Sequence, residues 1–218
     1  MSERPRPDKI QTLIESLATY RAEGVFNPWQ ETCPLDLDAS APAARRQRLA
    51  CHLDAPEIRW LLIGEAAGYQ GCRYSGLTFT SERLILEGKV PRIAAPDGRL
   101  TRRKRPFSEP SATIVWNSLR LHDLSDQVVL WNAFPWHPMK PGNPLSNRTP
   151  TEKELAEGRP LLEHLLALYP QASLVAVGRK AAGTLRSLGL SPDAELRHPA
   201  MGGASEFRAG LGKMVARG

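Results

Sequence analysis

The sequence lacks the features of a membrane protein, a disulfide-stabilised protein or a cluster-bearing protein. Its 218 residues include only three cysteines, Cys33, Cys51 and Cys72, with no C-x-x-C pair. A disulfide framework is therefore not expected, and a four-thiolate iron–sulfur cluster lacks a ligand. No apolar stretch approaches a membrane span, and the first residues carry no apolar signal-peptide core. We expect a cytoplasmic protein with no membrane partner, with reduced thiols of which at least one is buried.

Internal repeats are also missing, and neither G-x-G-x-x-G nor a P-loop motif occurs. Hydrophobic residues make up 41% of the chain, enough for a sizeable core, so we expect a single domain over residues 1–218. Residues 1–56 are interpreted as an N-terminal helix and an irregular arm packed on that domain. The formal charge of +6, from 29 Lys+Arg against 23 Asp+Glu, favours a polyanionic partner but is also compatible with none.

Short apolar runs alternate with amphipathic segments from residue 58 onward. The runs predict strands, and the segments with helical spacing predict helices, one of which opens with a capping box at Thr151 and Glu154. The predicted strands are 58–63, 128–131, 174–177 and 194–197, and the predicted helices are 8–20, 81–87, 111–121 (capped by Ser111), 151–168, 180–188 and 205 onward. This order predicts an α/β fold with a parallel sheet covered by helices on both faces. Functional sites in such sheets lie at the carboxyl ends of the strands.

Three segments that follow predicted strands carry groups able to do chemistry. The first is Gly64-Glu65-Ala66-Ala67-Gly68, whose small residues let backbone N–H groups approach a ligand, although a tight turn explains them equally well. The second contains Asn132, whose amide can both donate to and accept from a flat base, although a turn residue is the simpler explanation. The third contains His198 in a loop with proline and glycines, where a structural histidine is the alternative.

Taken together, these segments resemble the uracil-DNA glycosylase superfamily. The matching order is Gly64-Glu65-Ala66-x-Gly68, then Gly76-x-x-Phe79, then a strand-end Asn132, then His198-Pro199. The stretch Asn147-Arg148-Thr149-Pro150-Thr151 resembles the N-R-x-P-T segment of family-four-like members. The resemblance covers about residues 58–210 and implies a three-layer αβα sandwich around a short, mostly parallel four-stranded sheet. It indicates a divergent, family-four-like bacterial branch without an iron–sulfur cluster.

The resemblance also implies a reaction and the residues that perform it. Members flip uracil out of DNA and hydrolyse its N-glycosidic bond, which leaves an abasic site for base excision repair. By position, Phe79 stacks on the flipped base, although it is also a plausible core residue, and Asn132 reads the base edge. Ala66 and Gly68 contact the base, and His198 donates to the uracil oxygen as negative charge builds there. The expected enzyme is a monomeric, monofunctional hydrolase that needs neither metal nor cofactor.

Contacts with single- or double-stranded DNA are expected on three segments. Met201 is placed to fill the gap left by the flipped base, with simple packing as the alternative, and Gly202 and Ser205 belong to the same loop. A basic run is a candidate phosphate contact or a solvated loop, and it comprises Arg102, Arg103, Lys104 and Arg105. Arg179 and Lys180 open a predicted helix, where backbone N–H groups favour anions.

The chain departs from its relatives where the attacking water and the base are held. Many relatives carry Asp or Asn at the position of Ala66, so Glu65 becomes the candidate for the water and Glu82 a second one. A tyrosine that excludes thymine in one branch is replaced by Gly68, which leaves Tyr69 or Tyr74 as substitutes. These departures keep open a glycosylase for hypoxanthine or xanthine, or a damaged- or abasic-DNA-binding protein with weak catalysis. A small-molecule nucleotide enzyme is the alternative from fold alone.

Overall fold

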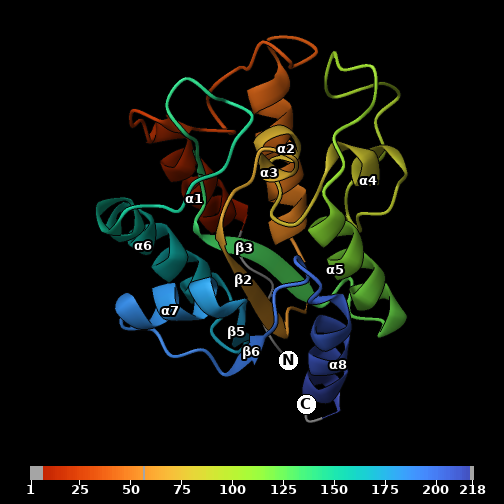
Figure 1. Cartoon of the computed structure of the whole chain (residues 1–218), viewed down its shortest axis with the longest axis vertical. Coiled ribbons are helices and arrows are strands. Elements are labelled where there is room, and N and C mark those ends of the chain that lie inside the picture. The colour runs from red at the N-terminus through yellow and green to blue at the C-terminus, as the bar shows by residue number, and fades with distance from the viewer. Residues whose placement is uncertain (1–6, 56, 217–218) are drawn as a thin grey trace.

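The computed structural model describes residues 7–55 and 57–216 (Figure 1). Residues 1–6, on which the expectation about a signal peptide rests in part, lie outside the described residues. Within the described ranges, every helix is too short or too polar to cross a membrane.

The core of the fold is a parallel four-stranded sheet in the order β3-β2-β5-β6. Its strands are β2 (Trp60–Ala66), β3 (Val128–Phe134), β5 (Ser173–Val177) and β6 (Ala194–Leu196). All three strand pairings are parallel, and the two central strands are almost wholly apolar because helices cover both of their faces. The predicted fold class is confirmed. A separate antiparallel ladder joins β1 (Val25–Phe26) to β4 (His137–Pro138).

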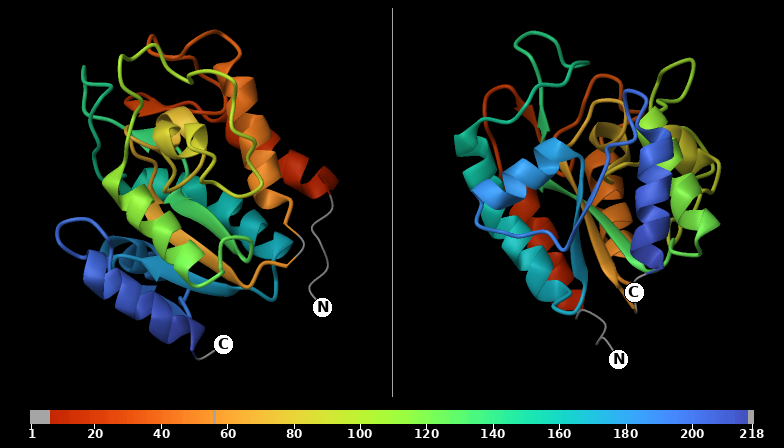
Figure 2. Two further views of the ribbon diagram at one scale, coloured as in Figure 1. Left: turned by 90° about the vertical axis from the view of Figure 1, so that its right-hand side faces the viewer. Right: turned by 60° about the horizontal axis from the view of Figure 1, so that its bottom comes forward.

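Helices cover both faces of the sheet (Figure 2, right). On one face lie α1 (Pro7–Thr19), α6 (Glu152–Leu168) and α7 (Arg179–Ser187). On the other lie α2 (Ala41–Leu53), α5 (Pro110–Leu121) and α8 (Ala204–Val215), and the short α3 (Cys72–Ser75) and α4 (Glu82–Leu86) belong to the connection after β2. The predicted capping box of α6 is present, since Thr151 Oγ1 accepts from Glu154 N–H and Thr151 N–H donates to the Glu154 carboxylate.

The prediction of an irregular arm is wrong over 41–53, where α2 forms. Leu49 and Leu53 lie one turn apart and are buried in the main core, which is the usual driving force for an amphipathic helix. Arg45 is buried on the same helix, although its charge hides the apolar pattern in the sequence. Its guanidinium pairs with Asp36 at 2.8 Å, so the buried charge is neutralised.

The strands β2 and β3 run further toward their carboxyl ends than the sequence predicts. β2 continues to Ala66 and β3 to Phe134, and the parallel register pairs Gly64 with Asn132. Because side chains alternate between the faces of a strand, Gly64 and Ala66 face one side of the sheet and Glu65 faces the other. The cap of α5 is also corrected, since Glu109 and not Ser111 is the N-cap residue.

Candidate active site

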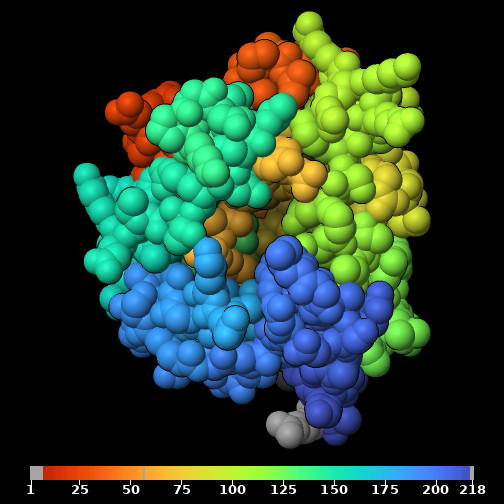
Figure 3. Space-filling model, viewed as in Figure 1, coloured from red at the N-terminus to blue at the C-terminus, as the bar shows by residue number. Residues whose placement is uncertain are grey.

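A pocket of about 770 Å³ opens at the carboxyl ends of the strands. Its walls come from the ends of β2 and β3, the loops after β5 and β6, the start of α5 and the loop before α6. Figure 3 shows the hollow in the middle of one face of the molecule, between segments that lie far apart in the sequence. The placement follows the rule for open parallel sheets.

Asn132 and Gly64 form the floor of the pocket. Asn132 is only 3% exposed, and its amide makes no hydrogen bond with any residue that the structure describes. A Cβ added to Gly64 would lie 2.6 Å from Asn132 Oδ1 and 3.2 Å from Phe79 Cζ. A side chain at this position of β2 would therefore push the amide oxygen aside and crowd the ring. The Asn132 amide lies at the pocket with its donors and its acceptor available to a ligand.

Phe79 lies beside this floor in a strained turn. Its φ of +47° is in the left-handed region, where a non-glycine residue costs about 1–3 kcal/mol. Two hydrogen bonds hold the turn, from Thr80 Oγ1 to the Thr78 carbonyl and from Trp116 Nε1 to Thr80 Oγ1, both at 3.0 Å. The ring is 7% exposed and lines the pocket.

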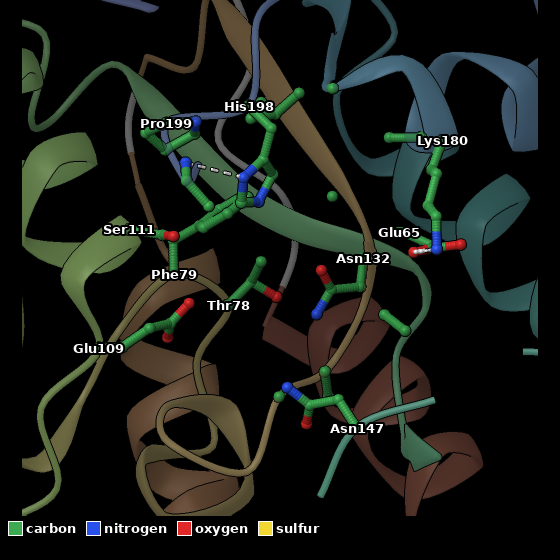
Figure 4. A pocket seen from close by; sticks show the side chains of 18 of the residues that line it. Glu65, Thr78, Phe79, Glu109, Ser111, Asn132, Asn147, Lys180, His198 and Pro199 are labelled. Carbon is green, nitrogen blue, oxygen red and sulfur yellow. Dashed lines mark hydrogen bonds and ion pairs between the residues drawn. The ribbon is translucent and has the colours of Figure 1, made fainter. Parts of the chain in front are cut away.

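His198 enters the same pocket from the loop after β6, with its ring centroid 5.8 Å from that of Phe79 (Figure 4). Burial, and secondarily the charge of Arg197, lower the pKa of His198, so the ring is neutral near pH 7. Nδ1 accepts from Ala200 N–H at 3.1 Å. The neutral ring therefore carries its proton on Nε2, which is free to donate to a ligand.

Two glycines fix the position of the histidine loop. A Cβ on Gly178 would lie 2.9 Å from His198 Cβ, and one on Gly203 would lie 2.2 Å from the His198 carbonyl oxygen. Gly178 also has a φ of +96°, which side chains rarely adopt. The glycines that the sequence shows around His198 are thus needed for close packing of the loop.

Glu65 lies on the opposite side of β2 from Gly64, and its carboxylate is paired with Lys180. Glu65 Oε2 is 3.6 Å from Lys180 Nζ, which also donates to Thr149 Oγ1 at 2.7 Å (Figure 4). The residue lines the pocket. The ion pair with Lys180 links the Glu65 side chain to the first turn of α7.

Sequence reasoning missed Glu109, which also lines the pocket. It is the N-cap residue of α5, but its side chain makes no capping hydrogen bond and instead lies against Gly71, where a Cβ would come within 1.9 Å of Glu109 Oε2. Burial raises the pKa of Glu109 from 4.5 to about 7. In the part of the chain that the structure describes, no hydrogen-bond donor or cation neutralises this carboxylate.

The loop after β2 is held in place by the segment Asn147-Arg148-Thr149-Pro150-Thr151. Asn147 Oδ1 accepts from Tyr69 N–H at 3.0 Å, and Asn147 lines the pocket beside Gly68. Arg148 forms a bidentate pair with Glu154 at 2.7 and 2.6 Å, which anchors the segment to α6. The segment therefore connects α6 to the loop after β2.

Some of the residues predicted to contact DNA line the pocket, and the others lie outside its lining. Met201, Arg179 and Lys180 line the pocket mouth, and Met201 is 93% exposed with a φ of +53°, which rules out the packing alternative. Gly202 and Ser205 are exposed beyond the pocket lining.

The basic run 102–105 lies away from the pocket, in a loop that projects at the upper right of Figure 3. Arg102 Nε donates to the carbonyls of Asp36 and Leu37, and the Arg103 guanidinium lies 4.1 Å from the centre of the Phe107 ring. These contacts support the loop. Lys104 and Arg105 are exposed.

Three further candidates from the sequence do not line the pocket: Tyr69 and Tyr74, considered for excluding thymine, and Glu82, considered for holding the attacking water. Tyr74 stacks on Phe107 with centroids 4.1 Å apart, and Tyr69 meets the same ring edge-on at 6.5 Å, so neither ring blocks a base. Glu82 is fully buried, and its carboxylate accepts from the backbone N–H groups of residues 100, 101 and 107. It anchors the basic loop and is not positioned to hold the attacking water.

With this geometry in view, comparisons with known proteins identify the family. The model of the uracil DNA glycosylase superfamily matches residues 52–211. The chain belongs to the uracil-DNA glycosylase superfamily. It is therefore a DNA glycosylase, a hydrolase of DNA repair that releases a base from DNA.

A solved structure with the same fold is wild-type SMUG2 from Pedobacter heparinus. It is 14% identical, with a TM-score of 0.65, and the match covers 97% of this chain and 95% of that one. At this identity the match shows the fold of a superfamily member over nearly the whole chain. No curated protein matches the sequence.

Proposed function

We propose that this glycosylase is monofunctional, removes uracil from DNA and leaves an abasic site. The observation that supports the proposal most strongly is the meeting of Phe79, Asn132 and His198, from three separate segments, in one pocket at the strand ends. The whole site comes from one chain, so we propose that the enzyme acts as a monomer.

The pocket suits a flipped pyrimidine. Phe79 offers a π-face for stacking, worth about 1–3 kcal/mol per base. Asn132 has an unsatisfied donor and an unsatisfied acceptor side by side, and uracil presents a carbonyl oxygen next to a ring N–H. A ligand with that edge would satisfy the buried amide, which offsets part of the cost of extruding the base.

His198 supplies the electrostatic stabilisation that the reaction needs. As the C1′–N1 bond breaks, the sugar becomes oxocarbenium-like and the electron pair moves onto the uracil ring. A neutral imidazole with its proton on Nε2 donates to the uracil oxygen as charge develops there. Because the ring is already fixed by Ala200 N–H, little reorganisation is required.

The DNA is proposed to lie across the mouth of the pocket, with Met201 entering the gap left by the base and with phosphates near Arg179 and Lys180. The variant Arg179→Ala/Lys180→Ala is expected to bind more weakly and less salt-dependently. The slope of log Kobs against log salt should fall in magnitude by about 1.4 on single-stranded and about 1.8 on double-stranded DNA, because two phosphate contacts are lost.

Binding is measured by fluorescence anisotropy between about 50 and 200 mM salt, a range in which DNA affinity depends strongly on salt concentration. Lys153→Ala/Arg159→Ala on α6, away from the pocket lining, is the control for a change of net charge alone. Lys104→Ala/Arg105→Ala tests the exposed part of the basic loop separately. An unchanged slope in the α7 variant would exclude phosphate contacts at that helix.

Substrate identity is tested by incubating the protein with single- and double-stranded DNA that contains one uracil, hypoxanthine or xanthine. Alkali cleavage at abasic sites and detection of the free base report the product. We expect uracil to be released fastest, without added metal or cofactor and with multiple turnovers. Release of none of the three bases contradicts the proposal and favours a damaged-DNA-binding protein.

A second candidate substrate is hypoxanthine or xanthine. It is favoured by the absence of the Tyr69 and Tyr74 rings from the pocket, which leaves the space beside Gly68 open except for Asn147. Hypoxanthine also presents a carbonyl next to a ring N–H, so Asn132 suits both bases. The same substrate panel separates the two candidates.

A further inference from the structure

The proposed reaction needs a group that holds the attacking water, and the expected position for it is occupied by Ala66, whose methyl group cannot do so. Glu65, the neighbouring candidate, faces the other side of β2 and is paired with Lys180. The pocket contains one further carboxylate, that of Glu109.

We propose that Glu109 is the catalytic residue that binds and deprotonates the water attacking C1′. This inference rests on the proposed function of the pocket and extends it by one residue. Three observations support it: the carboxylate lines the same pocket as Phe79 and His198, it has no donor or cation among the described residues, and it is turned away from the helix that it caps. Figure 4 shows it on the α5 side, across the pocket from Glu65 and Lys180.

Gly71 explains why the carboxylate reaches this place. Because a Cβ at Gly71 would lie 1.9 Å from Oε2, only glycine leaves room for Glu109 in its present position. An N-cap glutamate normally gains stability from the N–H groups of the first helical turn. Here that interaction is absent and the carboxylate lacks a hydrogen-bond or ion-pair partner among the described residues, which is the kind of uncompensated cost that is retained at functional sites.

The proposed step balances as follows. The C1′–N1 bond breaks and its electron pair leaves with uracil, while the water oxygen forms a bond to C1′. One water proton passes to the Glu109 carboxylate and the other stays on the new 1′-hydroxyl. The proton on Glu109 is then released to solvent or to the departing uracil anion, so water and the nucleotide give an abasic site and uracil. Before this step, the negative carboxylate also stabilises the positively charged sugar.

The ionisation of Glu109 suits this role near neutral pH, because a base is most effective when its pKa is close to the working pH. The ionisable group near it on α3 is the Cys72 thiol, and burial, together with the charge of Glu109, keeps that thiol neutral by raising its pKa. The neighbouring α5 residues in the pocket, Ser111 and Ile114, carry no charge, and His198 across the pocket is neutral.

The test compares Glu109→Gln and Glu109→Ala with Glu65→Gln, under single-turnover conditions and with the base that wild-type protein releases fastest. We expect Glu109→Gln to lower the rate about 10²-fold, the low end for a general base, because the bond to water is little formed in a dissociative transition state. The wild-type rate should rise with pH through about 7, because Glu109 must be deprotonated, and this rise should vanish in Glu109→Gln. Affinity for DNA carrying an abasic site should be unchanged, and Glu65→Gln should keep the pH dependence.

Chemical rescue separates catalysis from a structural effect. Added formate should restore part of the rate of Glu109→Ala, since a small carboxylate can enter the vacated space, but should not accelerate Glu109→Gln. A Glu109→Gln rate close to wild type, or a loss with an unchanged pH profile and no rescue by formate, would overturn the inference. If the wild-type protein releases hypoxanthine but not uracil, the uracil proposal fails while the role of Glu109 is still tested on hypoxanthine. If it releases no base, both fail together.

Discussion

Replacing His198 by alanine is expected to slow base release about 10²–10³-fold under single-turnover conditions. The reason is the loss of one preorganised donor to the uracil oxygen, in a pocket where a hydrogen bond to a developing anion is worth about 3–4 kcal/mol. Nδ1 is engaged by Ala200 N–H and burial keeps the ring neutral, so the wild-type donor is available without rearrangement. The measurement is rapid-quench kinetics on uracil-containing DNA at saturating enzyme.

The effect should appear in the chemical step and not in binding. Affinity for abasic-site DNA is expected to stay within about threefold, because His198 faces the base and its contribution is made mainly in the transition state. His164→Ala on α6, outside the pocket lining, is the matched control and should keep the wild-type rate. A His198→Ala protein that releases uracil at the wild-type rate would remove His198 from the mechanism.

The parts of the site that follow directly from strand patterning were predictable. Asn132 and His198 come after apolar runs, and parallel strands bring such positions to one edge of the sheet. The actual register adds what the sequence alone does not contain: β2 and β3 extend past their predicted ends, so that Asn132 lies within a strand opposite Gly64. Glu65 was recognised as a pocket residue, but its partner Lys180 depends on the packing of α7, which no local pattern specifies.

Glu109 was missed because its position depends on a tertiary contact. It lies in a segment whose sequence indicates a loop, and the residue that makes room for it, Gly71, is far away in the chain. The helix α2 was missed for a related reason, since Arg45 occupies a buried position that an apolar pattern would have marked. In both cases a charged residue is placed by distant partners, and sequence periodicity carries no information about such partners.

The basic run 102–105 illustrates the opposite error. Clustered arginines favour a phosphate contact on composition alone. In the structure, Arg102 donates to the carbonyls of Asp36 and Leu37, and Arg103 lies over the ring of Phe107. The Glu82 carboxylate holds the backbone of the same loop. Charge that already has partners within the protein is less available to DNA. By this criterion Arg179, which is exposed at the start of α7 and lines the pocket, is a stronger candidate than Arg102 and Arg103, whereas Lys180 must exchange its pairing with Glu65 for a phosphate.

Asn132→Ala is expected to lower the rate of uracil release by about 10²–10³-fold while leaving the stability of the protein close to that of the wild type. The rate falls because two hydrogen bonds to the base are lost, together about 3–4 kcal/mol when one of them goes to a group that gains charge. Stability is unaffected by lost hydrogen bonds, because the amide makes none within the described structure although it is only 3% exposed.

A loss of rate without a loss of stability makes the variant informative. Asn117→Ala on α5, an exposed position outside the pocket lining, is the matched control for rate and for the midpoint of thermal unfolding. If Asn132 serves ligand binding, the variant loses activity and unfolds at or above the temperature of the control. If it is instead part of the structural core, unfolding shifts to a lower temperature and activity falls only in proportion to the folded fraction. The second outcome would mean that the buried amide is satisfied within the free protein, and the proposed role of Asn132 in base recognition would have to be abandoned.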